Sequence, residues 1–340
     1  MIDVNQTLTN FNLFYTHIYA EMDLIHLHEI NPDTLRSEKI DGFITSCTSQ
    51  NRCTYLAQLI NVNCKHKFVI TDKSTAHSSE TKALFDTFMN LKFEPLLIQN
   101  NESVVFEKLL YTLLNQRVPH VNILIDYSCM PKKWYTCIID CITKHNFPPE
   151  KVNLFLSYTP KKFSNPANSK NIEYLGPVHA QSDALASKRP VAMIAALDHN
   201  IEIITEAVKR VKPAKIMAFM PFCDHDPDYA QTVIKNNENL LKQLSKDHII
   251  QYNLSRPEET ESMLTSFCLE HRLNAEVMIV PQGPKLFSLL SKLIAVRYPD
   301  IKLWEIIVNN RKKNNEQALP AGKPIVMKTV FINEDIDIDE

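Results

Sequence analysis

Two loops of this sequence combine a proline with a lysine, each after an apolar run that is typical of a buried strand. The pairs are Pro131-Lys132 and Pro284-Lys285. Proline is tolerated in the first turn of a helix, because the N–H group that it lacks would have no partner there. The adjacent lysine places an ammonium group beside the positive end of that helix, which is the outline of a phosphate site. The alternative is that each proline only starts a helix and each lysine faces solvent. The residues of these loops that we expect to contact a ligand are Asp126, Ser128, Lys132, Lys133, Gly283 and Lys285.

Short hydrogen-bonding side chains follow the first predicted strand of each half of the chain. In the first half, Arg52 could add a bidentate contact to a phosphate. Its counterpart in the second half is Ile201, which cannot, so we expect the two halves to be unequal. The short polar residues are also good helix N-caps, and capping is their alternative role. The candidate ligand-binding residues of these two loops are Ser49, Asn51, Arg52, Asp198 and Asn200.

Catalytic roles are harder to assign from the sequence. Should the chain be an enzyme, Asp126 and Ser128 at a strand end are the best candidates, with Lys132 as an electrostatic stabiliser. No spacing typical of a serine hydrolase, a zinc protease or an EF-hand occurs, so we assign no nucleophile or base. Residues 223–229 include histidine and aspartates, but consecutive loop residues before a helix fit capping better than metal binding. We therefore expect neither a metal nor a cofactor.

The elements that position these loops are predicted from alternating apolar runs and helical patterns, which are typical of βαβ units. Continuous apolar runs indicate strands buried on both faces, and hence mainly parallel sheets. We predict an α/β protein with two tandem Rossmann-like modules, each a mainly parallel sheet flanked by helices. The predicted strands are 42–46, 67–71, 94–99, 121–127 and 152–158 in the first half, and 191–197, 215–221, 249–253, 276–280 and 302–308 in the second.

A tandem duplication explains why both loops recur at a nearly constant spacing, from Asn51 to Asn200 and from Lys132 to Lys285. The alternative is that any two α/β halves look alike once they are aligned. The prolines and scattered polar residues between the halves indicate a linker, and the last residues indicate an added edge strand with an acidic tail. The predicted divisions are an N-terminal extension at 1–40, a first module at 41–160, an irregular linker at 161–189, a second module at 190–310, and a C-terminal strand and tail at 311–340.

Composition narrows the classes of partner. The chain has 340 residues and a net charge of −2, which gives no basic field for long nucleic acids. No apolar run reaches the roughly 18 residues of a membrane span, and no signal pattern opens the chain. The eight cysteines include no CxxC pair, and we expect a cytoplasmic protein with reduced thiols. Only four glycines occur, which excludes the glycine-rich phosphate loops of dehydrogenases and P-loop ATPases.

The segments 126–132 and 282–285 resemble the strand-four signature of CRISPR-associated Rossmann fold (CARF) sensor domains, in which a strand ends in Asp-x-Thr-Gly-Gly-Thr-Lys. The first segment retains the Asp, a Ser for the first Thr, and the Lys, whereas the second retains one Gly and the Lys. The resemblance extends in layout over both halves, roughly 41–160 and 190–310. Cys129-Met130 replaces the two glycines of the first copy, and a proline replaces the second Thr in both copies. A methionine or proline blocks the closest backbone approach, so the identity of the ligand stays open.

The resemblance implies that the strand-one and strand-four loops of two modules together surround a cyclic nucleotide. Our leading hypothesis is therefore a sensor that binds a phosphorylated nucleotide, with a cyclic oligonucleotide second messenger as the ligand that the resemblance implies. A role in prokaryotic antiviral defence follows from the same resemblance, with output through an effector protein in trans. The alternatives are an enzyme that cleaves or modifies such a signal, like a ring nuclease, and a non-catalytic scaffold subunit of a defence complex.

Overall fold

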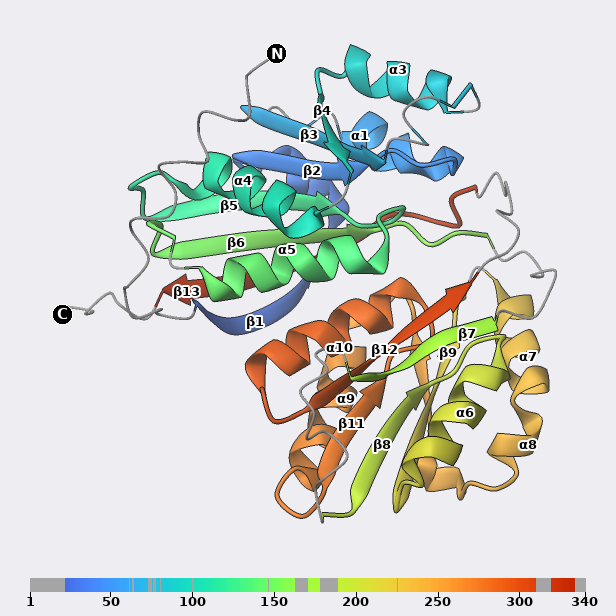
Figure 1. The fold of residues 1–340 in the computed structure, drawn as a ribbon. Helices are drawn as coiled ribbons and strands as arrows, with labels where there is room; N and C mark the ends of the chain where they lie inside the picture. The colour runs from blue at the N-terminus through green and yellow to red at the C-terminus, as the bar shows by residue number, and fades with distance from the viewer. Residues whose placement is uncertain are drawn as a thin grey trace.

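Two α/β modules make up the described part of the chain (Figure 1). Each module is a mainly parallel sheet flanked by helices, which confirms the predicted fold class. None of the helices that the structure describes has the length and apolar character needed to cross a membrane. The computed structural model describes residues 22–60, 62, 64–72, 75, 78–79, 81–99, 101–145, 147–162, 171–177, 189–224, 226–309 and 319–333.

The sheet of the first module has seven strands in the order β1-β13-β6-β5-β2-β3-β4. The five strands from β6 to β4 are parallel to one another, and every residue of β2 is buried, as its continuous apolar run predicts. The two remaining strands are antiparallel to their neighbours. The strands are β1 (Met22–Ile30), β2 (Gly42–Ser46), β3 (His66–Asp72), β4 (Glu94–Ile98), β5 (His120–Asp126), β6 (Lys151–Tyr158) and β13 (Ile325–Asn333).

Helices connect the parallel strands of the first module and cover its sheet. Helix α5 begins at Lys132 directly after Pro131, as the proline-lysine pair predicts. The helical elements are η1 (Pro32–Arg36), η2 (Asn51–Thr54), α1 (Tyr55–Ile60), α3 (Lys82–Asn90), α4 (Glu102–Leu114) and α5 (Lys132–Lys144).

The sheet of the second module has six strands in the order β10-β9-β8-β11-β12-β7. Its five strands from β10 to β12 are parallel, and β7 is antiparallel to β12. The strands are β7 (Asn171–Pro177), β8 (Val191–Ala196), β9 (Lys215–Phe222), β10 (Ile249–Asn253), β11 (Glu276–Val280) and β12 (Lys302–Asn309). The helical elements are α6 (Ile201–Val211), α7 (Pro227–Asn236), α8 (Glu238–Leu241), η3 (Lys246–His248), α9 (Pro257–His271) and α10 (Lys285–Arg297).

The two modules have the same strand order and exchange one strand with each other. In both, the parallel strands lie in the order third, second, first, fourth, fifth, and an antiparallel strand is added beside the fifth. Strand β7 follows β6 in the chain but pairs with β12, whereas β13 follows β12 but pairs with β6. Asn171 and Ile325, which begin the two strands, are separated by almost the same length of chain as Lys132 and Lys285. The exchanged strands therefore occupy equivalent places in the two sheets.

This exchange corrects two predictions. We predicted 161–189 as an irregular linker, but residues 171–177 form β7. The prediction failed because an apolar strand flanked by prolines and polar residues resembles a loop in composition. We also predicted an edge strand near the C-terminus, but β13 lies between β6 and β1. Strand β1 comes from the predicted extension 1–40 and covers the outer side of β13. The predicted acidic tail, 334–340, lies outside the described residues.

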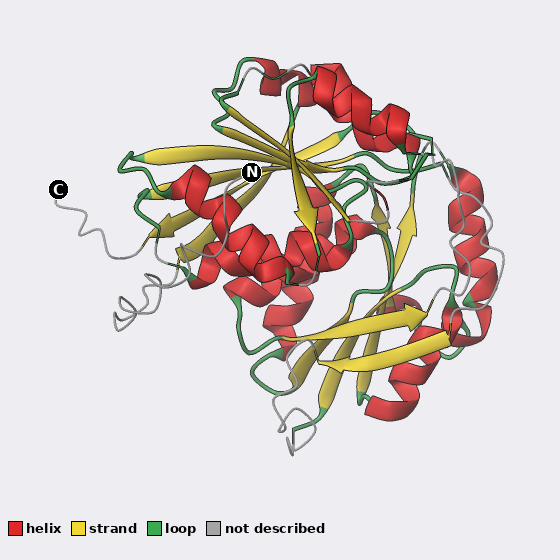
Figure 2. Ribbon diagram, turned by 45° about the horizontal axis from the view of Figure 1, so that its top comes forward, coloured by secondary structure: helices red, strands yellow, loops and turns green. Residues whose placement is uncertain are grey.

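Helices α5 and α10 pack against each other at the junction of the modules, and both also contact β1. Figure 2 shows helices lying between the two sheets. The Lys292 ammonium of α10 forms an ion pair with the Asp140 carboxylate of α5, and Lys292 is only 7% exposed. A single cluster of buried apolar side chains runs across the junction. Because loss of the Asp140 carboxylate would leave the buried Lys292 charge unpaired, this pair helps to fix how α5 and α10 meet.

The central place of β13 gives a test of the exchanged arrangement. Phe331 is fully buried in β13, so Phe331→Ala should lower the free energy of unfolding by about 3–5 kcal/mol. Leu273→Ala is the control, because Leu273 is 83% exposed, and it should change that free energy by less than about 0.5 kcal/mol. Urea denaturation measures both, and equal stability of the two variants would contradict a buried β13.

Candidate functional site

The loop after β5 folds around the Asp126 carboxylate. Its Oδ1 atom accepts hydrogen bonds from the Ser128 backbone N–H at 3.0 Å and from the Ser128 hydroxyl. The same hydroxyl accepts from the Thr159 N–H at 2.8 Å, which ties this loop to the end of β6. Burial raises the pKa of Asp126 to about 6, although hydrogen bonds from Ser128 and the nearby charges of Arg52 and Lys285 oppose the shift. The buried surroundings of the carboxyl therefore disfavour its ionised form.

Arg52 joins the strand-one loop to the same place. It lies in η2, is 3% exposed, and donates through Nη2 to the Ser128 carbonyl at 2.8 Å. Its Nη1 donates to the Thr159 carbonyl, and its Nε donates to Gln50 Oε1 at 3.1 Å. The guanidinium thus fixes the carboxyl ends of β5 and β6 relative to the loop after β2.

Lys285 reaches this loop from the second module. It is the first residue of α10, and its ammonium donates to the carbonyls of Ser128 at 2.9 Å and Met130 at 2.6 Å. Two cationic side chains, Arg52 and Lys285, therefore converge on the Ser128 carbonyl. Burial is the main cause that lowers the pKa of Lys285 to about 7. The two strand-four loops therefore meet at this point.

The charges at this junction do not balance. The positive charges of Arg52 and Lys161 also lower the pKa of Lys285, whereas Asp126 and Cys129 oppose the shift. When it is ionised, Asp126, whose pKa is raised to about 6, can offset only one of the two cations. We name Arg52, Lys285, Asp126 and Ser128 the junction cluster. A bound anion would offset the repulsion between its cations.

Three buried hydroxyls close to the junction cluster have no hydrogen-bond partner among the described residues. They belong to Ser46 at the end of β2 and to Ser157 and Thr159 at the end of β6. Strand β5, which ends in Asp126, lies between β2 and β6. Buried hydroxyls usually have a partner, and leaving one without costs roughly 1–3 kcal/mol. These groups are suited to hydrogen-bond a polar ligand or water at this edge of the sheet.

The other predicted residues of the first module lie outside the cluster. Lys132 is half-buried, and burial lowers its pKa to about 8 while the charge of Glu305 in β12 opposes the shift. Lys133 forms an ion pair with Glu102 at 2.6 Å and is 68% exposed. Ser49 and Asn51 are exposed, and neither caps η2, whose N-cap is Gln50 without a side-chain hydrogen bond. Lys132 and Lys285 therefore have different surroundings despite their equivalent places.

The predicted residues of the second module stabilise their own loops. Asp198 Oδ1 accepts hydrogen bonds from the His199 backbone N–H at 2.8 Å and from the Tyr229 hydroxyl at 3.2 Å. Asn200 caps α6 by accepting from the Glu202 N–H at 3.1 Å, which is the alternative role that we expected. Gly283 allows a close approach, because a Cβ there would lie 3.0 Å from the Leu197 carbonyl oxygen. These polar side chains form hydrogen bonds within their own module, whereas the first module supplies three of the four residues of the junction cluster.

Residues 223–229 lie in the loop after β9 and in the first turn of α7. No group of three potential metal ligands occurs among the described side chains. Asp224 instead accepts a hydrogen bond from Asn253 at 2.9 Å, and Asp226 precedes the first residue of α7. His225 lies outside the described residues.

Sequence reasoning missed the residues that complete the cluster from the end of β6. Thr159 supplies both an N–H group and a carbonyl, and Lys161 adds positive charge, but we predicted only a strand end and a linker there. The available signal was the pair of hydroxyl residues, Ser157 and Thr159, at the carboxyl end of the predicted fifth strand. Ligands of parallel sheets bind at such ends.

Comparisons with known proteins do not identify the chain. No protein-family model matches it, and no curated protein matches it. Among solved structures, an N-terminal ketoreductase from a macrolactin assembly line is 10% identical over 84% of this chain and 74% of its own, with a TM-score of 0.21. A TM-score this low supports no inference about this chain, so its function rests on the geometry of the site.

The raised pKa of Asp126 predicts a pH-dependent stability. Between the ordinary value of 3.8 and about 6, the folded protein keeps a proton that the unfolded chain releases, so the free energy of unfolding falls as the pH rises. Asp126→Asn removes this titration but keeps an oxygen that can accept from Ser128. The stability of the wild type relative to the variant should fall by up to about 3 kcal/mol between about pH 4 and about pH 7. Urea denaturation across this range tests it, and parallel pH profiles would contradict the buried place of the carboxyl.

Proposed function

We propose that this chain is a ligand-binding regulatory protein that holds a phosphorylated nucleotide at the junction of its modules. Lys285 is the proposed direct contact to phosphate, and Arg52, whose three side-chain nitrogens donate to Gln50, Ser128 and Thr159, adds positive charge beside it. The observation that carries the proposal is the convergence of the buried Arg52 and the half-buried Lys285 on the Ser128 carbonyl, beside a carboxyl whose pKa is raised to about 6. Phosphate would supply the negative charge that offsets the second of the two cations, and an ammonium group donates readily to its oxygens.

The place of the cluster in the sheets supports the same proposal. In an open α/β sheet, ligands bind beyond the carboxyl ends of the strands, at the point where the strand order reverses. That point lies between β2 and β5 in the first module and between β8 and β11 in the second. Arg52 follows β2, Ser128 follows β5 and Lys285 follows β11. The two reversal points therefore supply the residues of one cluster.

The finer parts of the proposal come from the resemblance to CARF sensor domains. It makes a cyclic oligonucleotide the first ligand to test, and prokaryotic antiviral defence the setting. Output would pass to an effector protein in trans. We propose that the protein acts in the cytoplasm.

Binding is better supported than turnover. An enzyme that cleaves its signal would need an accessible nucleophile or base, and Ser128 and Asp126 were the best candidates. The Ser128 side chain is fully buried, and its hydroxyl donates to Asp126 while it accepts from Thr159. The hydroxyl is therefore engaged in holding the loop.

Lysine substitutions test the proposed contacts. Lys285→Met should weaken nucleotide binding by about tenfold or more, because a hydrogen bond to a charged group contributes roughly 1.5–3 kcal/mol. Lys132→Met is the matched control, since it removes the equivalent lysine outside the cluster, and it should change the affinity by less than about threefold. Calorimetry with mononucleotides and cyclic oligonucleotides measures both variants. Absence of nucleotide binding by the wild type would favour the scaffold alternative.

A further inference from the structure

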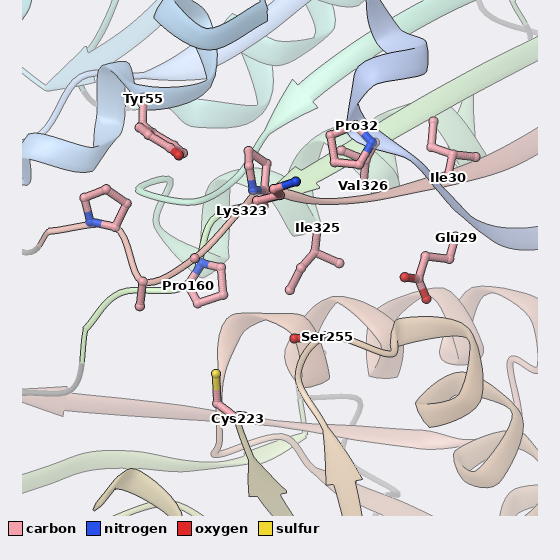
Figure 3. A pocket seen from close by; sticks show the side chains of 14 residues that line it. Glu29, Ile30, Pro32, Tyr55, Pro160, Cys223, Ser255, Lys323, Ile325 and Val326 are labelled. Carbon is pink, nitrogen blue, oxygen red and sulfur yellow. The ribbon is translucent and has the colours of Figure 1, made fainter. Parts of the chain in front are cut away.

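A cleft of about 600 Å³ lies at the boundary of the two modules (Figure 3). Its walls come from segments that are far apart in the sequence. Cys223 and Ser255 line it from the second module, where they follow β9 and β10. The remaining lining residues are Glu29, Ile30, Pro32, Tyr55, Pro160, Pro320, Ala321, Gly322, Lys323, Pro324, Ile325 and Val326.

The cleft shares two short segments of chain with the junction cluster. Tyr55 lines the cleft and begins α1, directly after η2, which carries Arg52. Pro160 lines the cleft and follows Thr159, whose carbonyl accepts a hydrogen bond from Arg52. These two links place the cleft beside segments that carry the junction cluster, although no residue of the cluster itself lines it.

The lining has the mixed chemistry of a small-molecule site. Four prolines and the aliphatic side chains of Ile30 and Ile325 form stiff apolar walls. In Figure 3 the Tyr55 hydroxyl is directed toward the open space, and Ser255 lines the cleft from the second module. Small-molecule sites combine apolar walls with a few convergent polar groups and have volumes of roughly 300–1,000 Å³. An aromatic ring such as that of Tyr55 stacks on nucleobases of any type.

Backbone contacts hold the walls in place. On one side, the Ala321 N–H donates to the Pro160 carbonyl at 2.8 Å, and Gly322 makes the following turn with a φ of 88°. On the other side, the Ser255 N–H donates to Asn253 Oδ1 at 2.8 Å. A site whose walls are fixed before binding loses less conformational entropy when a ligand enters.

We propose that this cleft binds the nucleoside part of the phosphorylated ligand. The base packs against Tyr55 and the proline walls, the hydroxyls of Tyr55 and Ser255 bond to its polar edge, and the phosphate extends to the junction cluster. This inference rests on the proposed function and adds to it a site that recognises the base.

Filling the cleft tests the inference. Ser255→Trp places an indole in the open space, and Ser262→Trp is the matched control, because Ser262 is an exposed residue of α9. The probes are inorganic pyrophosphate and the 5′-diphosphates of adenosine, guanosine, cytidine and uridine, which share a diphosphate and differ in the nucleoside. At least one nucleoside diphosphate should bind the wild type more tightly than pyrophosphate does. Ser255→Trp should weaken its binding by about tenfold or more, and change the affinity for pyrophosphate by less than about twofold.

A second variant distinguishes loss of the binding site from misfolding of the first variant. Tyr55→Ala removes the stacking ring from the opposite wall and should also weaken nucleoside diphosphate binding while sparing pyrophosphate. Thermal melting confirms that each variant is folded. If Ser255→Trp and Tyr55→Ala bind the nucleoside diphosphate as the wild type does, the cleft is not the nucleoside site, although the proposed function stands. If the wild type binds neither pyrophosphate nor any nucleotide, the proposed function itself is wrong.

Discussion

The Lys285 ammonium, held by two carbonyls of the opposite module, is the contact on which the candidate site depends. A buried ammonium is costly unless it is hydrogen-bonded, and the carbonyls of Ser128 and Met130 supply its partners. Arg52 shares the Ser128 carbonyl, so one loop holds cations from both modules. This arrangement brings two cationic side chains to one loop, although the whole chain carries a net charge of −2.

The exchanged strands help to hold the two modules, and therefore this contact, in place. Because β7 belongs to the second sheet and β13 to the first, the chain crosses the junction in both directions. The packing of α5 against α10 and the ion pair between Lys292 and Asp140 then fix how the two strand-four loops face each other. Separation of the modules would expose apolar core and break this buried pair, so the loops are held together by the fold. The cleft lies beside the same crossing, because the residues before β13 form one of its walls.

The sequence was sufficient to predict the fold class, because continuous apolar runs and helical spacing are local signals. It was also sufficient to predict the polar loops, and Arg52, Asp126, Ser128 and Lys285 do converge. It could not predict that Lys285 joins the junction cluster and Lys132 does not. The two lysines have the same local pattern and differ only in the residues that the other module places beside them. Carbonyls surround Lys285, whereas the charge of Glu305 acts on Lys132. The strand exchange was missed for the same reason, because a strand's pairing partner is a non-local property.

The titration of the Lys285 ammonium tests the central claim most directly. Lysine can be labelled with ¹³C at Cε, and the resonance of Lys285 can be assigned by comparison with Lys285→Met. Its chemical shift is then followed against pH with and without a nucleotide. The account predicts a pKa of about 7 in the free protein, and a higher pKa when a bound phosphate stabilises the charged form. An ordinary lysine pKa that no nucleotide changes would contradict it.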